Sequence, residues 1–180
     1  MAHTHDAEDP ACAVAHTEAH SEAHSEAPAE PAGRTLVAVF ASPVAECLLR
    51  FGAELGFRPI LFEPDPERRI EGFTAVTGLG PWLDATADVV LTDHHREEIG
   101  PVLRDVLKFP VRWVGIMGSA RHTAPHVRAL ADLGVPAEEI ARVHRPIGLN
   151  IGSRTPPEIA VATLAGLIAD RNARPGGFAF

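Results

Sequence analysis

Short, continuously apolar segments alternate with amphipathic segments from residue 35 onward, and this alternation limits the folds open to the chain. We expect strands at 36–40, 58–63, 87–91 and 111–116, and a short strand near 141–143. Amphipathic helices are expected at 43–55, 97–108, 123–133 and 156–171. Apolar strands that alternate with helices form a parallel sheet covered on both faces. The sequence therefore predicts an α/β fold over residues 35–172, a doubly wound, mostly parallel Rossmann-like sheet with helices on both faces.

The first 34 residues have a different composition, with much Ala, Glu, His and Ser and almost no large apolar side chains. Such a segment buries too little surface to offset its ordering entropy, so we expect a disordered, His-rich tail over 1–34. A four-residue repeat spaces His16, His20 and His24 for one helix face, which predicts a weak site for zinc, nickel or copper. The alternative, a solvated low-complexity tail, is favoured. Residues 173–180 are expected to form a flexible end.

Most of the net charge of −8 comes from the tail, which contains seven acidic residues and a single arginine. The remainder is nearly neutral and offers no broad basic surface for nucleic acid or an anionic membrane. No apolar run reaches the roughly 18 residues of a membrane span, and the N-terminus lacks a signal-peptide pattern. The two cysteines, Cys12 and Cys47, are not placed as a structural pair. We expect a cytoplasmic protein.

Two loops carry glycine, serine and arginine in an order that suits an anionic ligand. One follows the strand at 111–116, and the other precedes a helix marked by an N-cap threonine, a proline and a capping-box glutamate. Loops at the carboxyl edge of an α/β sheet and helix N-termini both bind ligands and anions. For the loop before the helix, the alternative is a tight turn whose glycines serve geometry alone. The candidate binding residues are Gly118, Ser119, Arg121, Gly148, Gly152, Ser153, Arg154 and Thr155.

The first strand–helix turn departs from the dinucleotide-binding pattern Gly-x-Gly-x-x-Gly. Phe40, Ser42 and Ala45 stand at its three glycine positions. The first glycine makes the tight turn and the second admits a pyrophosphate, so we expect weak or absent NAD binding. Glu63 ends the second predicted strand, where an acid normally binds the ribose hydroxyls. Glu63 is therefore a candidate binding residue, although a glutamate at a strand end also occurs by chance.

A third polar segment, 92–95, follows the strand at 87–91 and reads Thr-Asp-His-His. Its place at the carboxyl edge of the sheet is compatible with a binding role. The favoured alternative is that Asp93 or a neighbour caps the next helix and the two histidines lie at the rim.

The segment 113–119, Trp-Val-Gly-Ile-Met-Gly-Ser, and the segment 144–160, His-Arg-Pro-Ile-Gly-Leu-Asn-Ile-Gly-Ser-Arg-Thr-Pro-Pro-Glu-Ile-Ala, together resemble the signature of the XdhC/CoxI family. Members are accessory proteins of molybdenum hydroxylases, and the resemblance covers the family's Rossmann-like domain. It implies that the chain binds molybdenum cofactor (molybdopterin) and delivers it to a xanthine dehydrogenase-type enzyme. The pterin phosphate would then lie at Gly118 and Ser119 or before Thr155, with Arg121 and Arg154 as cationic partners.

The resemblance and the missing nucleophile–base–acid arrangement favour an accessory or chaperone protein over an enzyme. Further partners to consider are a sulfurtransferase, a separate accessory subunit and a second copy of the chain. Two other functions stay open at this point. One is an NAD-dependent oxidoreductase, which Phe40 and Ser42 disfavour. The other is a non-catalytic Rossmann-like scaffold that pairs with a separate cofactor-binding subunit.

Overall fold

A computed structural model describes residues 33–118 and 124–177. Six parallel strands form one sheet in the order β3-β2-β1-β4-β5-β6, which is the strand order of a doubly wound dinucleotide-binding fold. The strands are β1 (Arg34–Val39), β2 (Phe57–Phe62), β3 (Ala75–Val76), β4 (Ala87–Leu91), β5 (Trp113–Ile116) and β6 (Val143–His144). The predicted fold class is confirmed. Strand order reverses between β1 and β4, so ligands are expected at the carboxyl ends of these neighbouring strands.

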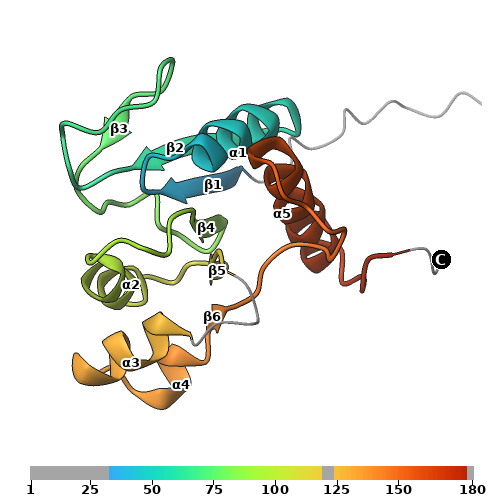
Figure 1. Ribbon diagram of the computed structural model, residues 1–180. Helices are drawn as coiled ribbons and strands as arrows, with labels where there is room; N and C mark the ends of the chain where they lie inside the picture. The colour runs from blue at the N-terminus through green and yellow to red at the C-terminus, as the bar shows by residue number, and fades with distance from the viewer. Residues whose placement is uncertain (1–32, 119–123, 178–180) are drawn as a thin grey trace, which may run out of the picture.

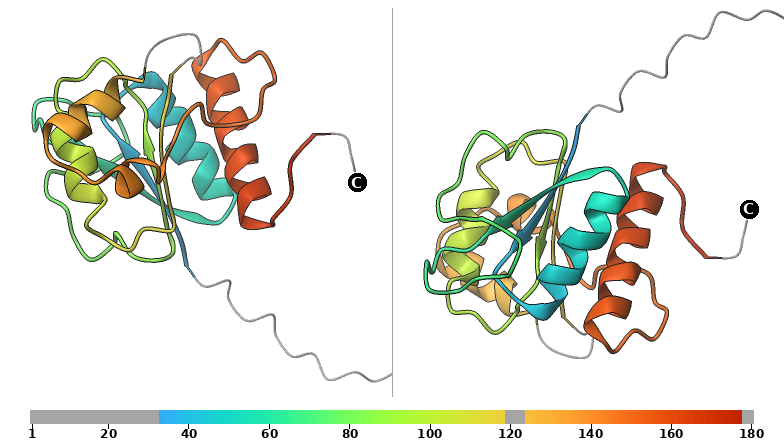
Figure 2. Two further views of the ribbon diagram at one scale, coloured as in Figure 1. Left: turned by 90° about the horizontal axis from the view of Figure 1, so that it is seen from below. Right: turned by 90° about the horizontal axis from the view of Figure 1, so that it is seen from above.

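Helices cover both faces of the sheet, as Figures 1 and 2 show. Helices α1 (Pro43–Glu54) and α5 (Pro156–Arg171) pack together on one face. Helices α2 (Ile99–Val106) and α3 (Pro125–Asp132) pack together on the other, and α4 (Ala137–Ile140) follows α3. The two-residue strand β3 and the one-turn helix α4 were not predicted from the sequence. Helices α2 and α3 begin at Ile99 and Pro125, two residues later than expected.

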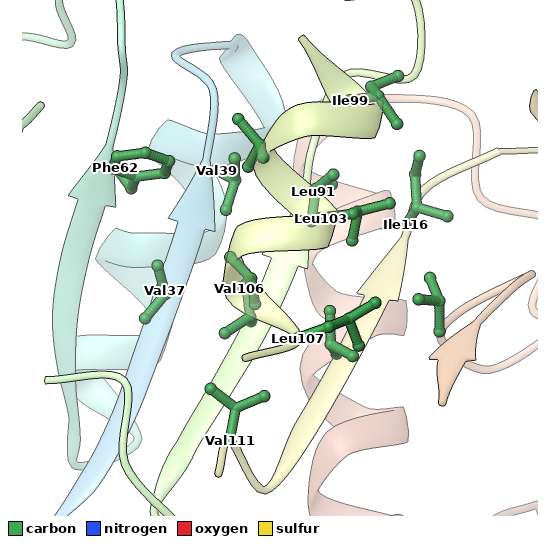
Figure 3. Close-up of a cluster of buried hydrophobic side chains, with 14 of the residues drawn as sticks. Val37, Val39, Phe62, Leu91, Ile99, Leu103, Val106, Leu107, Val111 and Ile116 are labelled. Atoms are coloured by element: carbon green, nitrogen blue, oxygen red, sulfur yellow. The ribbon is translucent and has the colours of Figure 1, made fainter. Parts of the chain in front are cut away.

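Alternate residues of the central strands point into two separate cores. Val37 and Val39 of β1 pack toward α2 with Leu103, and Figure 3 shows this cluster. Leu36 and Ala38 pack toward α1 and α5 on the opposite face. Side chains in a strand alternate between faces, so a strand that is apolar at every position must be covered on both sides. The continuous apolar runs in the sequence are therefore explained by the helices that cover both faces of the sheet.

The amino ends of the strands are joined to α5 by a buried ion-pair group. Asp88 on β4 is fully buried and accepts hydrogen bonds from Nε of Arg112 and from Nε of Arg171. Arg112 also pairs with Asp170 near the end of α5. Both oxygens of Asp88 are thus paired, which is the condition for burying a carboxylate. This group fixes the C-terminal end of α5 against the sheet at the edge opposite the candidate site.

Within the described ranges, no helix is both long and apolar enough to cross a membrane. The predicted His-rich tail, with His16, His20 and His24, lies outside the described residues. Ser119 and Arg121 also lie outside them.

Candidate functional site

One cleft of about 750 Å³ opens at the carboxyl ends of β4 and β5. It lies next to the reversal of strand order, where this class of fold binds ligands. Its volume falls within the range of small-molecule sites, about 300–1,000 Å³. The lining residues come from α1, the ends of β4 and β5, the segment 146–153 and α5: Val44, Thr92, His94, Met117, Gly118, residues 146–153, Ile159, Ala162 and Thr163.

Four of the predicted binding residues share this cleft. Gly118, from the first loop, lines it together with Gly148, Gly152 and Ser153 from the second. The fold therefore brings these four residues, from two loops that are distant in sequence, to one edge of the sheet. Thr155 and the exposed Arg154 do not line the cleft, although both lie at the start of α5, which forms one of its walls.

The second loop is shaped by a close contact with α5. Gly148 has a φ of 80°, and a Cβ added there would lie 2.9 Å from the main-chain carbon of Ala162. The amide of Leu149 donates to the carbonyl of Ala162 at 2.9 Å. On the helix side, a Cβ at Gly166 would lie 2.9 Å from Cα of Gly148. Gly148 is therefore required both by its left-handed backbone and by the space it leaves for α5.

The first loop lies against an arginine that the sequence analysis did not select. A Cβ added at Gly118 would lie 2.7 Å from Nε and 2.8 Å from Nη2 of Arg145. The guanidinium of Arg145 thus rests on the main chain at the end of β5, beside the cleft. Arg145 lies in the segment 144–160, which carries part of the family resemblance. Its contact with Gly118 spans 27 positions of sequence, so only the folded chain reveals it.

The start of α5 carries its own negative charge. The carboxylate of Glu158 accepts hydrogen bonds from the amides of Arg154 at 2.8 Å and Thr155 at 3.1 Å. The hydrogen bond from the amide of Arg154, and then the one from Thr155, lower the pKa of Glu158 below its usual range. The predicted capping box is therefore formed. It also places a carboxylate at the helix end where an external anion was predicted, so amides that would attract an anion already have a partner.

The first strand–helix turn keeps the shape of a glycine turn although it contains none. Phe40 has a φ of 73° and is fully buried. Ser42 caps α1 by accepting from the amide of Ala45 at 3.0 Å, and its hydroxyl donates to Thr92 at 3.0 Å. The Oγ1 of Thr92 in turn donates to the carbonyl of Phe40 at 2.8 Å. These hydrogen bonds of Ser42 and Thr92 stabilise the turn, which in the dinucleotide-binding pattern is made by glycines.

Glu63, a predicted binding residue, lies below this turn and is fully buried. Its Oε2 accepts from the amide of Ala41 at 2.8 Å, and its Oε1 accepts from the amide of Asp65 at 3.0 Å. The guanidinium of Arg96 donates to both oxygens, at 3.2 and 3.1 Å. Each carboxylate oxygen therefore has two protein donors. Glu63 does not line the cleft, and its hydrogen bonds stabilise the first turn.

The polar segment after β4 contributes one residue to the cleft. His94 lines it beside Thr92. The Oδ1 of Asp93 accepts from the amide of His95 at 2.9 Å, and the two histidine rings lie 4.0 Å apart. Asp93 thus closes a local turn, and no side chain caps α2, whose N-cap residue is Glu98. In the described parts of the chain, no group of three metal-ligating side chains comes together.

Comparisons with known proteins indicate a family and a fold for this chain. The family model described as the XdhC Rossmann domain matches residues 36–167. The uncharacterized protein YqeB of Escherichia coli (strain K12) is 32% identical over 156 residues, which cover 79% of this chain and 28% of YqeB. A crystal structure described as a xanthine dehydrogenase from Bacillus halodurans has a similar fold, with a TM-score of 0.62 and 22% identity. That match covers 82% of this chain and 45% of the other, so the chain spans less than half the length of either protein.

Proposed function

This chain belongs to the XdhC Rossmann-domain family, and we propose from that premise that it is an accessory protein of a xanthine dehydrogenase-type molybdenum hydroxylase. In this proposal it holds molybdenum cofactor in the cleft at the carboxyl ends of β4 and β5, which we therefore call the cofactor cleft. It then assists insertion of the cofactor into the enzyme. The observation that carries the proposal is the position of the cleft at the carboxyl ends of β4 and β5, lined by the segments that bear the family's signature.

The residues of the cleft fit a flat, anionic ligand of this kind. Gly152 leaves main chain open to the ligand, since a Cβ there would meet no atom of the described residues within 4 Å. Met117, Ile147 and Ile159 supply apolar walls for a ring system. Arg145 places a positive charge beside Gly118, where an anionic group can be held. When bound, the cofactor supplies the redox-active molybdenum, and the protein's own residues bind and orient it.

The geometry favours a binding role over NAD-dependent oxidation. Phe40, Arg96 and Glu63 fill the region under the first turn, where a dinucleotide would need open main chain and a free ribose acceptor. Ser119, Arg121, Arg154 and Thr155 stay candidates from the sequence. The scaffold alternative, in which a separate subunit binds the cofactor, shares the fold and predicts an empty cleft.

The test is to purify the protein from a host that makes molybdenum cofactor, and to measure molybdenum by mass spectrometry and pterin by fluorescence after oxidation. We expect both to copurify with the protein. The variant Gly152→Val fills the cleft and should lose both. Gly134→Val is the matched control, because Gly134 has a similar φ of 72° but lies away from the cleft.

Retention by the wild type and the control, with loss in Gly152→Val, supports the proposal. Protein that folds but carries neither molybdenum nor pterin would contradict it and favour the scaffold. Equal loss in both glycine variants would mean that backbone strain, not occupation of the cleft, abolishes binding, and would contradict the assignment of the site.

A further inference from the structure

A second pocket, of about 700 Å³, lies between α3, α4 and β6. We call it the α3–α4 pocket, and it shares only Pro146 with the lining of the cofactor cleft. Its walls are mostly small and apolar, including Val127, Ala131, Ile140 and Val143. Neither the family signature nor the proposed cofactor site uses these residues. Two polar side chains line the pocket among the described residues, His126 and Arg145.

His126 is buried in this pocket with an unsatisfied nitrogen. The residue is 3% exposed, and its Nδ1 has no hydrogen-bond partner among the residues that the structure describes. Buried polar atoms are almost always paired, and those that are not often lie where a ligand or ion completes the site. Since His126 lines a cavity, a ligand there can reach the ring. The unpaired nitrogen is therefore an observation that points to a ligand, independent of the shape of the pocket.

Arg145 gives the pocket its charge. It is the only residue with a permanent charge among the described residues lining it, and no aspartate or glutamate lines it from α3, α4 or β6. Burial, and then the positive charge of Arg145, lower the pKa of His126, so the imidazole is neutral near pH 7. A neutral ring can donate one hydrogen bond to an anion that also pairs with the guanidinium. In an apolar surrounding this pairing is stronger than in water.

We propose that the α3–α4 pocket binds a small organic acid. The apolar body of the acid packs on Val127, Ala131 and Ile140, and its carboxylate binds the guanidinium of Arg145 and the ring N–H of His126. This inference does not depend on the proposed cofactor function, because it concerns a separate cavity and a different ligand. Arg145 lines the α3–α4 pocket and contacts Gly118 at the edge of the cofactor cleft, whereas His126 lines the α3–α4 pocket alone.

Benzoate is a suitable probe, because its carboxyl group stays ionised above about pH 5. The experiment titrates benzoate into the full chain, free of molybdenum cofactor, and follows the ring resonances of His126 by NMR. Acetate lacks the apolar body and benzyl alcohol lacks the charge. We expect saturable shifts with benzoate, and binding at least about tenfold weaker for the other two compounds, a difference of about 1.4 kcal/mol or more. Bound benzoate should also raise the pKa of His126, because its negative charge stabilises the imidazolium.

Three variants sharpen the test. Arg145→Gln and His126→Leu should each weaken benzoate binding about tenfold or more. Arg128→Gln is the matched control, since Arg128 lies on α3 but its side chain is 90% exposed and does not line the pocket. His126→Leu should leave molybdenum and pterin retention unchanged, so failure here and failure of the proposed function are distinguishable. Absence of any His126 shift in the wild type would overturn the inference, as would benzoate binding that survives Arg145→Gln, or equal affinity for benzyl alcohol.

Discussion

The guanidinium of Arg96 lies over the ring of Phe40, with its Cζ 4.5 Å from the ring centroid. The same guanidinium pairs with Glu63 and Glu98, and its side chain is only 7% exposed. The hydrogen bond with Glu98, and then the one with Glu63, raise the pKa of Arg96. The hydrogen bond from Arg96 lowers the pKa of Glu98 to about 2. The side chains of Arg96 and Phe40 therefore occupy the region under the first turn. Related folds leave this region open for a dinucleotide.

The first prediction is that the wild-type chain does not bind NAD with micromolar affinity in a calorimetric titration. Phe40 holds the turn in the conformation of a glycine but fills the space that a glycine would leave. Arg96→Ala alone should not restore binding, because Phe40 remains. The double variant Phe40→Gly/Arg96→Ala is expected to bind NAD more tightly than the wild type and more tightly than Arg96→Ala. Micromolar binding by the wild type would revive the oxidoreductase function.

Most of the fold was predictable from the sequence because its strands are apolar at every position and its helices carry clear start and stop signals. Pro43 and Pro156 mark the first turns of α1 and α5, and both helices begin there. The strand β3 and the helix α4 were missed because two and four residues are too short to show a period. Ala137–Ile140, for example, completes barely one helical turn.

The site was predictable only in part, because its decisive contacts are distant in sequence. Gly118 and Gly152 were selected from local loop patterns, and both line the cleft. Glu63 was correctly placed at the end of β2, but its partner Arg96 lies 33 positions away and gives it a different setting. Arg145 carries no local signal that separates it from a surface arginine. Local patterns thus located the loops, while the fold determined which side chains meet.

The second prediction concerns the buried carboxylate of Asp88. Asp88→Ala should lower the free energy of unfolding by about 3–5 kcal/mol, because it leaves Arg112 and Arg171 without their buried partner. Urea denaturation followed by circular dichroism measures the change. The matched control is Asp132→Ala, whose partner Arg128 lies 3.6 Å away on the surface. That exposed pair should contribute less than about 1 kcal/mol. Equal effects of the two variants would contradict a structural role for the Asp88 group.

The third prediction concerns pH and the start of α5. The pKa of Glu158 is lowered in the folded protein by the amides of Arg154 and Thr155. A lowered folded-state pKa stabilises the protein above the unfolded value of about 4.3, and this stabilisation is lost as pH falls through the folded value. Glu158→Gln should therefore lower the melting temperature at pH 7, and the difference from the wild type should shrink below pH 4. A difference that is constant from pH 7 to pH 3 would show that the charge of Glu158 is not responsible.

The fourth prediction compares two glycines of the segment 146–153. Gly148 and Gly152 have similar φ angles, 80° and 71°, so alanine at either position carries a similar backbone cost of about 1–2 kcal/mol. They differ in their surroundings. A Cβ at Gly148 would lie 2.9 Å from the main chain of Ala162, whereas one at Gly152 would meet no atom within 4 Å in the described parts of the chain. Only Gly148→Ala must therefore displace the segment from α5.

We expect Gly152→Ala to lower the free energy of unfolding by about 1–2 kcal/mol and Gly148→Ala to lower it by a further 1–3 kcal/mol, the cost of overpacking. Urea denaturation of both variants gives the two values. Because displacement of the segment also moves one wall of the cofactor cleft, Gly148→Ala should lose molybdenum and pterin together with stability. If the two variants are equally stable, the segment adjusts to a Cβ at residue 148 without cost. The contact between Gly148 and α5 would then not determine the position of that wall.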